Sequence, residues 1–179
     1  MDSKDGELIA DVRRGNTEAV TRLADRYLSV CYSIALSFLH LTEDAEDAAQ
    51  QAMMNAISSI HQLRDNEKFR PWLYQIVRNT SRGYLRKRKD VQCDYDFSNT
   101  PSEDRNHEKR TSDKQVLLSG LKTLSESERQ VMLLHDMEGM NHKEVGEMLG
   151  ISEEYSRQHL FVARKKMKRI LSENGGKNG

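Results

Sequence analysis

Apolar residues recur at three- and four-residue steps through most of this chain, and the alternation typical of strands does not persist. In the first half, the pattern predicts a short helix at residues 8–15 and a long helix at 20–39. Thr42 is placed to cap a third helix, which runs to residue 60. Polar residues occupy 62–68, and Pro71 suits the first turn of a fourth helix at 72–88. The chain is therefore predicted to be all-α.

The stretch 124–171 carries closely spaced helix start and stop signals. Two capping-box pairs, a glycine that can end a helix and one further cap follow in chain order as Ser125–Glu128, Asn141–Glu144, Gly150 and Ser152. Residues at helical spacing after the last cap are expected to face inward: Ser156, Leu160, Ala163, Met167 and Ile170. The layout is helix, tight turn, helix, followed by a basic end.

The other side of the last helix must then face outward or sideways. It carries Arg157, Gln158, Phe161, Arg164 and Lys165. Arginine and glutamine suit base edges in a DNA major groove, and the following cations suit phosphates. The alternative interpretation is an ordinary pair of core helices with a solvated basic end.

Composition favours small helical cores in a soluble protein. The 179 residues are 31% charged and 36% hydrophobic, and no apolar run approaches the ~20 residues that a membrane span needs. The N-terminus has no apolar signal core, so we expect a cytoplasmic protein, associated with the nucleoid when active. A disulfide between Cys31 and Cys93 is not expected in that compartment.

Net charge is zero, yet the charges are segregated along the chain. Basic residues form one block at 78–89 and another at 164–169, whereas acids gather at 43–47 and at 90–104. Local rather than net charge governs the approach to DNA. The segment 91–112 is acidic and poor in apolar residues, so we predict a flexible linker. It divides the chain into two small helical domains at 1–90 and 113–174, with a tail at 175–179.

The predicted helix at 72–88 has an apolar face and a basic face. One face carries Trp72, Ile76, Val77, Thr80 and Tyr84, which could pack inward. The other face gathers Gln75, Arg78, Asn79, Arg82 and Arg86, and the segment before it supplies Asn66, Lys68, Phe69 and Arg70. Aromatic surfaces beside cations suit an unpaired DNA strand. Alternatively, Phe69, Trp72 and Tyr84 are core residues and the arginines form a solvated face. We favour the core for Trp72 and DNA contact for the arginines.

An enzymatic interpretation finds little support. Carboxylates at 43, 44, 46 and 47 could share a metal, but no second acidic cluster completes a site, and acids are favourable at a helix N-terminus anyway. The histidines lack zinc-like spacing, although His159 could contact DNA. We therefore expect no catalytic residues, no metal, no cofactor and no small-molecule substrate.

Three segments together resemble bacterial sigma factors of the extracytoplasmic-function (ECF) group, over nearly the full chain. They are the acidic helix that begins Asp44-Ala-Glu-Asp, the run Phe69-Arg-Pro-Trp-Leu-Tyr-Gln-Ile-Val-Arg-Asn, and the helix-turn-helix containing Glu144-Val-Gly-Glu-Met-Leu-Gly-Ile-Ser. Their order, with an acidic linker between, makes the resemblance specific. It implies a region 2 domain at 1–90 and a region 4 domain at 113–174.

The resemblance assigns a role to each surface. Core RNA polymerase would bind through its β′ coiled coil to Asp44, Asp47, Gln50, Gln51 and Met54. The −10 promoter element would contact Asn66, Lys68, Phe69, Arg70, Tyr74, Gln75, Arg78, Asn79, Arg82 and Arg86. The −35 element would contact Glu154, Tyr155, Arg157, Gln158, His159, Arg164 and Lys165, while this domain also meets the polymerase β flap. An anti-sigma factor, which could be membrane-anchored, is the further implied partner.

The chain departs from the family pattern at several positions. Met53 and Ile57 stand where aromatics are common, and Gln51 where glutamate is usual. Gly83 often corresponds to aspartate, and such a glycine costs about 1 kcal/mol of helix propensity relative to alanine. Arg82 replaces an apolar residue and could add a phosphate contact. Ser156 takes a position commonly filled by valine, which bears on the register and the promoter preference of the recognition helix.

Two non-enzymatic alternatives remain. A helix-turn-helix regulator that acts without polymerase would need neither the acidic docking helix nor the basic, aromatic helix at 72–88. An anti-sigma or adaptor protein would not need two separated basic faces.

Overall fold

The computed structural model describes residues 3–94 and 110–175, and these residues form helices and short connections, with no strand among them. The first module comprises α1 (Ser3–Arg13), α2 (Thr17–Leu39), α3 (Thr42–Ser59), η1 (Ile60–Gln62), η2 (Asn66–Lys68) and α4 (Phe69–Asp94). The second comprises α5 (Arg110–Thr123), α6 (Glu126–Met132), the π-helical turn η3 (Leu133–Met137), α7 (His142–Leu149) and α8 (Glu153–Gly175). The predicted all-α fold is confirmed.

Buried apolar side chains from both modules belong to one hydrophobic core cluster. In the first module, α2 and α3 pack along each other, and α4 lies across both. Small residues make this close packing possible, because α3 buries Ala45, Ala48, Ala49, Ala52 and Ala56. In the second, α8 contacts α5, α6 and α7 and buries Leu160, Ala163 and Met167. The predicted inward face of α8 is confirmed at these three positions.

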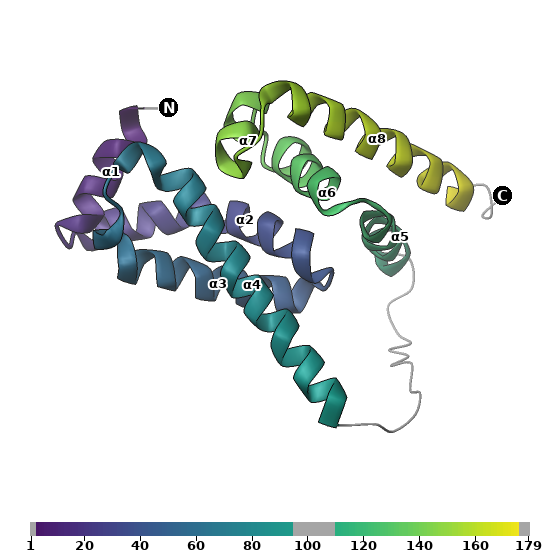
Figure 1. Ribbon diagram of the computed structural model, residues 1–179, viewed down its shortest axis with the longest axis horizontal. Helices are drawn as coiled ribbons and strands as arrows, with labels where there is room; N and C mark the ends of the chain where they lie inside the picture. The colour runs from purple at the N-terminus through teal and green to yellow at the C-terminus, as the bar shows by residue number, and fades with distance from the viewer. Residues whose placement is uncertain (1–2, 95–109, 176–179) are drawn as a thin grey trace.

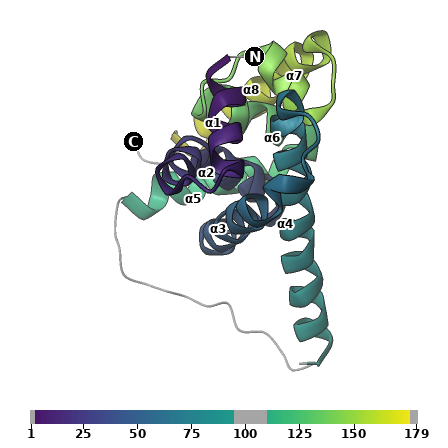
Figure 2. The same ribbon diagram turned by 90° about the vertical axis from the view of Figure 1, so that its left-hand side faces the viewer.

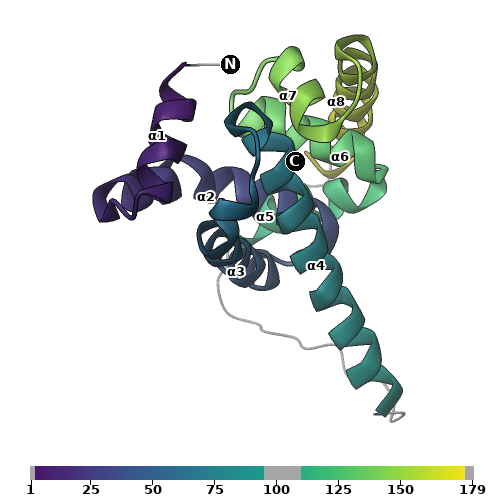
Figure 3. The same ribbon diagram turned by 60° about the vertical axis from the view of Figure 1, so that its left-hand side comes forward.

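The two modules lie side by side, with α6, η3 and α7 facing α2 and the first half of α4 (Figure 1). The far end of α4 projects away from both modules, as the turned views also show (Figures 2 and 3). None of the helices within residues 3–94 and 110–175 combines the length and apolar character that a membrane span requires.

The capping signals of the second module occur as predicted. Both capping boxes are present, at Ser125–Glu128 and at Asn141–Glu144. Gly150 ends α7 with φ 71° and ψ 36°, the left-handed conformation that a glycine adopts without penalty. The Ser152 hydroxyl accepts a hydrogen bond from the Tyr155 backbone N–H at 3.1 Å, so it caps α8.

Some local predictions were wrong. Thr42 is the first residue of α3 rather than its cap; Leu41 holds the cap position and provides no side-chain hydrogen bond. Leu117 and Met137 are exposed although their side chains are large and apolar. α4 begins before Trp72, at Phe69, and passes through Gly83 without a break. Most of the predicted linker, at 95–109, and the tail residues 176–179 lie outside the described residues.

Candidate nucleic-acid interface

The exposed side of α3 holds the residues predicted to contact polymerase. Asp47, Gln50, Gln51 and Met54 are exposed and Asp44 is half-buried, while the alanines of α3 face the core. Met54 is 62% exposed, which is high for a large apolar side chain. Next to it, Leu28, Tyr32 and Ala49 line a shallow, mostly apolar hollow between α2 and α3. An acidic helix beside an exposed apolar surface is suited to a protein partner.

The basic side of α4 carries the residues expected to hold a DNA strand. Gln75, Asn79, Arg82 and Arg86 are exposed, and the half-buried Arg78 donates to Gln75 Oε1 at 3.3 Å. Arg82 and Arg86 belong to the second half of α4. The end of this helix leads away from the body of the molecule (Figure 2). This part of the helix therefore presents cations to solvent from a rigid support.

Two aromatic residues predicted to contact DNA are buried instead. Phe69 is fully buried, and its ring packs edge-on against Tyr27 with centroids 5.1 Å apart. Tyr74 is also buried, and its hydroxyl donates to Gln130 Oε1 of α6 at 3.4 Å. Phe69 is a core residue that anchors the start of α4, so we leave it out of the proposed DNA contacts. Trp72, expected in the core, is partly buried against it.

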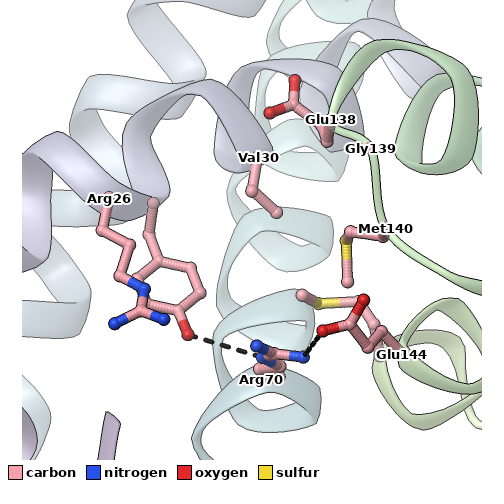
Figure 4. A pocket seen from close by; sticks show the side chains of 9 residues that line it. Arg26, Val30, Arg70, Glu138, Gly139, Met140 and Glu144 are labelled. Atoms are coloured by element: carbon pink, nitrogen blue, oxygen red, sulfur yellow. Dashed lines mark hydrogen bonds and ion pairs between the residues drawn. The ribbon is translucent and has the colours of Figure 1, made fainter. Parts of the chain in front are cut away.

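Arg70 is held in a polar network at the start of α4 (Figure 4). Its Nη2 lies 3.4 Å from Asp5 Oδ2, its Nε donates to the Tyr27 hydroxyl at 3.4 Å, and its Nη1 donates to Glu144 Oε1 at 3.0 Å. Burial alone would lower the pKa of Arg70, but the hydrogen bonds and Asp5 outweigh it and raise the pKa. Burial raises the pKa of Tyr27 to about 12, so both groups keep their protons.

The remaining residues before α4 differ in exposure. Lys68 is exposed, whereas Asn66 is half-buried and donates to the Gly6 carbonyl at 3.1 Å. Asn66 thus connects the segment before α4 to α1, whereas the exposed Lys68 is accessible to a ligand.

The N-terminal half of α8 displays the residues expected at the −35 element. Glu154, Tyr155, Arg157 and Gln158 are exposed. His159 is half-buried, and the centroid of its ring lies 4.0 Å from that of Tyr155. Arg157 forms an ion pair with Glu153, and Gln158 donates to Glu154 at 3.3 Å. These are exposed contacts within one helix, so they cost little to exchange for DNA.

Ser156 is fully buried, and a hydrogen bond satisfies its hydroxyl in this otherwise apolar position. Its hydroxyl lies 3.0 Å from Nδ1 of His142, at the start of α7. The hydroxyl and the ring join the two helices of the helix-turn-helix at a point where valine would offer only apolar contact. α8 keeps the predicted register, since Ser156, Leu160, Ala163 and Met167 are buried and Ile170 is half-buried.

The middle of α8 combines an exposed ring with cations. Phe161 is 71% exposed and lines a hollow with Leu160, Arg157 and Lys165. Arg164 makes a two-point ion pair with Asp136 of η3, which raises the pKa of its guanidinium. Arg164 is therefore partly neutralised here, whereas Lys165 is exposed.

Several charged residues at the site were missed by sequence reasoning. Asp5 is 1% exposed and lies 2.8 Å from Arg26 as well as close to Arg70. Glu138 and the buried Arg129 join the two modules. The spacing of residues along one helix cannot predict such contacts, because the two residues in each contact lie far apart in the sequence. Within the described residues, no group of three or more histidines, cysteines and acids is placed to hold a metal ion.

A helix-turn-helix in one module and a separate basic helix in the other are features typical of DNA-binding proteins. The family models for sigma-70 region 2 and sigma-70 region 4 match residues 23–91 and 120–169. The chain belongs to the sigma-70 family of RNA polymerase sigma factors, in its ECF group.

Relatives are similar over most of their length. The chain is 28% identical to the ECF sigma factor SigM of Bacillus subtilis over 86% of this chain and 95% of that protein. It is 30% identical to SigZ of the same organism over 70% and 72%, respectively. The solved structure of CnrH in complex with the cytosolic domain of CnrY superposes with a TM-score of 0.69 at 24% identity, covering 94% of this chain and 97% of that one. The structure of RpoE with the anti-sigma factor NepR from Bartonella quintana gives 0.61 at 20% identity, covering 85% and 96%.

Proposed function

We propose that this sigma factor binds core RNA polymerase through the exposed side of α3 and reads a promoter at two points. The loop at 62–68 and α4 hold the −10 element, and the N-terminal half of α8 enters the major groove at the −35 element. The chain supplies binding and strand capture for transcription initiation and has no catalytic role of its own. Extruding a base costs a few kcal/mol, which the cations of α4 offset by binding the displaced strand.

The observation that carries this proposal is the pairing of two basic helices on separate modules. Exposed Arg82 and Arg86 continue along α4, and exposed Arg157 and Gln158 lie at the start of α8. Each surface is proposed to bind DNA weakly alone. Two weak sites on one chain reinforce each other by effective concentration, above all when the polymerase fixes their spacing.

Further partners follow from the relatives. The β′ coiled coil fits the acidic, partly apolar side of α3, and the β flap is proposed to meet the second module. An anti-sigma factor is also proposed, since the solved relatives are a complex of CnrH with CnrY and a complex of RpoE with the anti-sigma factor NepR. We propose that this inhibitor could be anchored in the membrane and that the chain itself works in the cytoplasm, at the nucleoid.

Run-off transcription tests the proposal. Purified chain is added to core polymerase and a set of native promoters, and core binding is measured in parallel by co-purification. We expect promoter-specific transcripts, and their loss when Gln50, Gln51 and Met54 are replaced together by lysine. Absence of both core binding and transcripts would contradict the sigma function, and retained duplex binding would then favour a regulator that acts without polymerase.

A further inference from the structure

Two histidines lie stacked where η3, α7 and α8 meet. His135 belongs to η3 and His142 begins α7, and the centroids of their rings are 4.5 Å apart with an angle of 33° between the ring planes. Both side chains are half-buried. Histidine has an ordinary pKa of about 6.5, so a pair of rings in contact responds to small changes in acidity near neutral pH.

Each ring is held through its Nδ1 atom by a different neighbour. Nδ1 of His135 lies 2.9 Å from Asp136 Oδ1, and Nδ1 of His142 lies 3.0 Å from the hydroxyl of Ser156. Ser156 is fully buried on the inward side of α8. The contact therefore joins the start of α7 to the helix proposed to read the −35 element, and the position of that helix depends on the ring of His142.

The acidic groups beside the pair are already paired with arginines of α8. The carboxylate of Asp136 accepts from Arg164 through both of its oxygens, and Glu153 forms an ion pair with Arg157. These charges cancel, so one proton on the histidine pair leaves a net positive charge. A second proton would place a like charge at the stacking distance, where like charges repel.

Further positive charge surrounds His142. Lys165 and Lys168 of α8 line the same hollow, and His142 is the first residue of α7, where the helix dipole is positive. Burial, followed by the charges of His135 and the two arginines of α8, lowers the pKa of His142 against the opposing charge of Glu153. The neutral ring is therefore the form that fits the packed helices.

We propose that His142 is a positioning residue for −35 recognition, which holds α8 through Ser156 while the histidine pair is neutral, and that mild acid separates the two rings and weakens −35 binding. This inference rests on the proposed function, because it takes α8 as the helix that reads the −35 element. A separated His142 takes up a proton at the ordinary pKa of about 6.5, whereas the packed ring requires a lower pH. Acid below that value therefore favours separation.

The acid effect is measured on the full chain. Fluorescence anisotropy gives the Kd for a native −35 duplex and for a base-substituted duplex at pH ~7.5 and pH ~5.5. We expect the Kd for the native duplex to rise severalfold in acid, with an upper limit of about tenfold because the lower pH lies about one unit below the ordinary histidine pKa. A proton that only added a phosphate contact would instead strengthen binding in acid, and that result would overturn the proposal.

His142→Asn is the decisive variant, because asparagine places a polar atom near the position of Nδ1 and does not titrate. The ratio of the two Kd values is the readout, and this variant should lose most of the change. His135→Asn removes the other ring and should reduce the change in the same way. His61→Asn makes the same substitution at an exposed position of the first module and should retain the full change. An unaltered ratio in both pair variants would overturn the proposal.

Ser156→Ala distinguishes positioning from packing. It removes the hydroxyl that His142 contacts, so binding at the higher pH should weaken and the further loss in acid should shrink. A serine that only filled space would lower the affinity equally at both pH values and keep the ratio of the unmodified chain. That result would overturn the role of the contact between His142 and Ser156.

Histidine titration by nuclear magnetic resonance tests the pair on the full chain without DNA. His135→Asn should raise the pKa of His142, because it removes a neighbouring positive charge, and His61→Asn should leave it unchanged. The same pKa of His142 in all three chains would overturn the coupling of the two rings. Loss of −35 binding in every chain at the higher pH, with the coupling intact, would instead contradict the proposed −35 function and leave the acid-sensitive histidine pair supported.

Discussion

Asp5 shows how one buried charge organises a surface contributed by three helices. Its carboxylate is 1% exposed and lies near the guanidinium groups of Arg26 and Arg70, and it accepts from the Tyr27 hydroxyl at 2.8 Å. A buried carboxylate is tolerated when it is paired in this way, and removing one partner of such a group is costly. α1 lies before the matched residues 23–91, yet through Asp5 it helps to position the start of α4.

Gly146 lies where α7 comes closest to the turn of the helix-turn-helix. A Cβ atom at this position would stand 2.7 Å from the Ile151 carbonyl oxygen, which is backbone and cannot swing away. Gly146→Ala gains helix propensity, but displacing the turn costs more, so we expect a loss of about 1–3 kcal/mol in the free energy of unfolding. Urea denaturation would measure the loss, and a variant as stable as the unmodified chain would contradict the close approach.

Gly83 lies in the middle of α4 and provides the opposite case. Nothing stands within 4 Å of a Cβ atom built there, and the helix is continuous through it. Gly83→Ala should therefore stabilise the chain by about 0.5–1 kcal/mol, because alanine loses less backbone entropy on folding. Thermal unfolding would register a higher Tm, and a lower Tm would indicate a contact at Gly83 that the structure lacks.

At the scale of the helix, α8 is predicted to read the −35 element with Arg157 and Gln158. Arg157→Ala and Gln158→Ala should each weaken binding to a −35 duplex by about 1–3 kcal/mol if the side chains contact bases. Their partners Glu153 and Glu154 lie on the same helix and are exposed, so stability should barely change. The measurement is fluorescence anisotropy with native and base-substituted duplexes. Lys122→Ala, at an exposed position of α5, is the control, and unchanged discrimination in the α8 variants would rule out base contacts.

The basic side of α4 should instead affect how strongly DNA binding depends on salt concentration. Arg78→Ala removes a cation proposed to contact a phosphate, so the affinity for a −10 single strand should fall and its dependence on salt concentration should become shallower. Binding isotherms over a range of salt concentrations give the slope. The slope of the unmodified chain, if retained in the variant, would mean that Arg78 is only a solvated charge.

Helix ends and inward faces could be predicted from sequence because their causes are local. Capping boxes depend on residues three apart, and the burial of Leu160 and Ala163 follows from helical spacing. Tyr74 could not be placed in this way, since residues of α6 that lie far away in sequence bury it. Ser156 looked out of place in an apolar slot until its partner His142 was known. The residues proposed to bind DNA and polymerase remain predictions.

On the scale of the whole molecule, the packing of the two modules satisfies Arg70 and Glu138 internally. It leaves the outer side of α3, Arg82 and Arg86 of α4, and the start of α8 exposed. The surfaces proposed for polymerase, for the −10 strand and for the −35 duplex are therefore accessible at the same time.

His40 makes the packing of the modules sensitive to acid. It ends α2 in a left-handed conformation, with φ 59°, and its Nδ1 is buried without a hydrogen-bond partner. Burial, followed by the positive charges of Arg129 and Lys122 on the other module, lowers the pKa of His40 to about 4. A proton on His40 would thus place a third cation at this contact.

The direction of the pH effect follows from this lowered pKa. Above pH ~6.5 the imidazole is neutral in both the folded and the unfolded chain, whereas between pH ~6.5 and about 4 the unfolded chain alone takes up the proton. The free energy of unfolding should therefore decrease as the pH falls through this window, by at most about 3 kcal/mol from His40. His40→Asn tests whether His40 causes this decrease in the free energy of unfolding, because asparagine tolerates the left-handed conformation and does not titrate. Denaturation at pH 7 and pH 5 should show a smaller decrease in the variant, and equal decreases would mean that other groups carry the acid sensitivity.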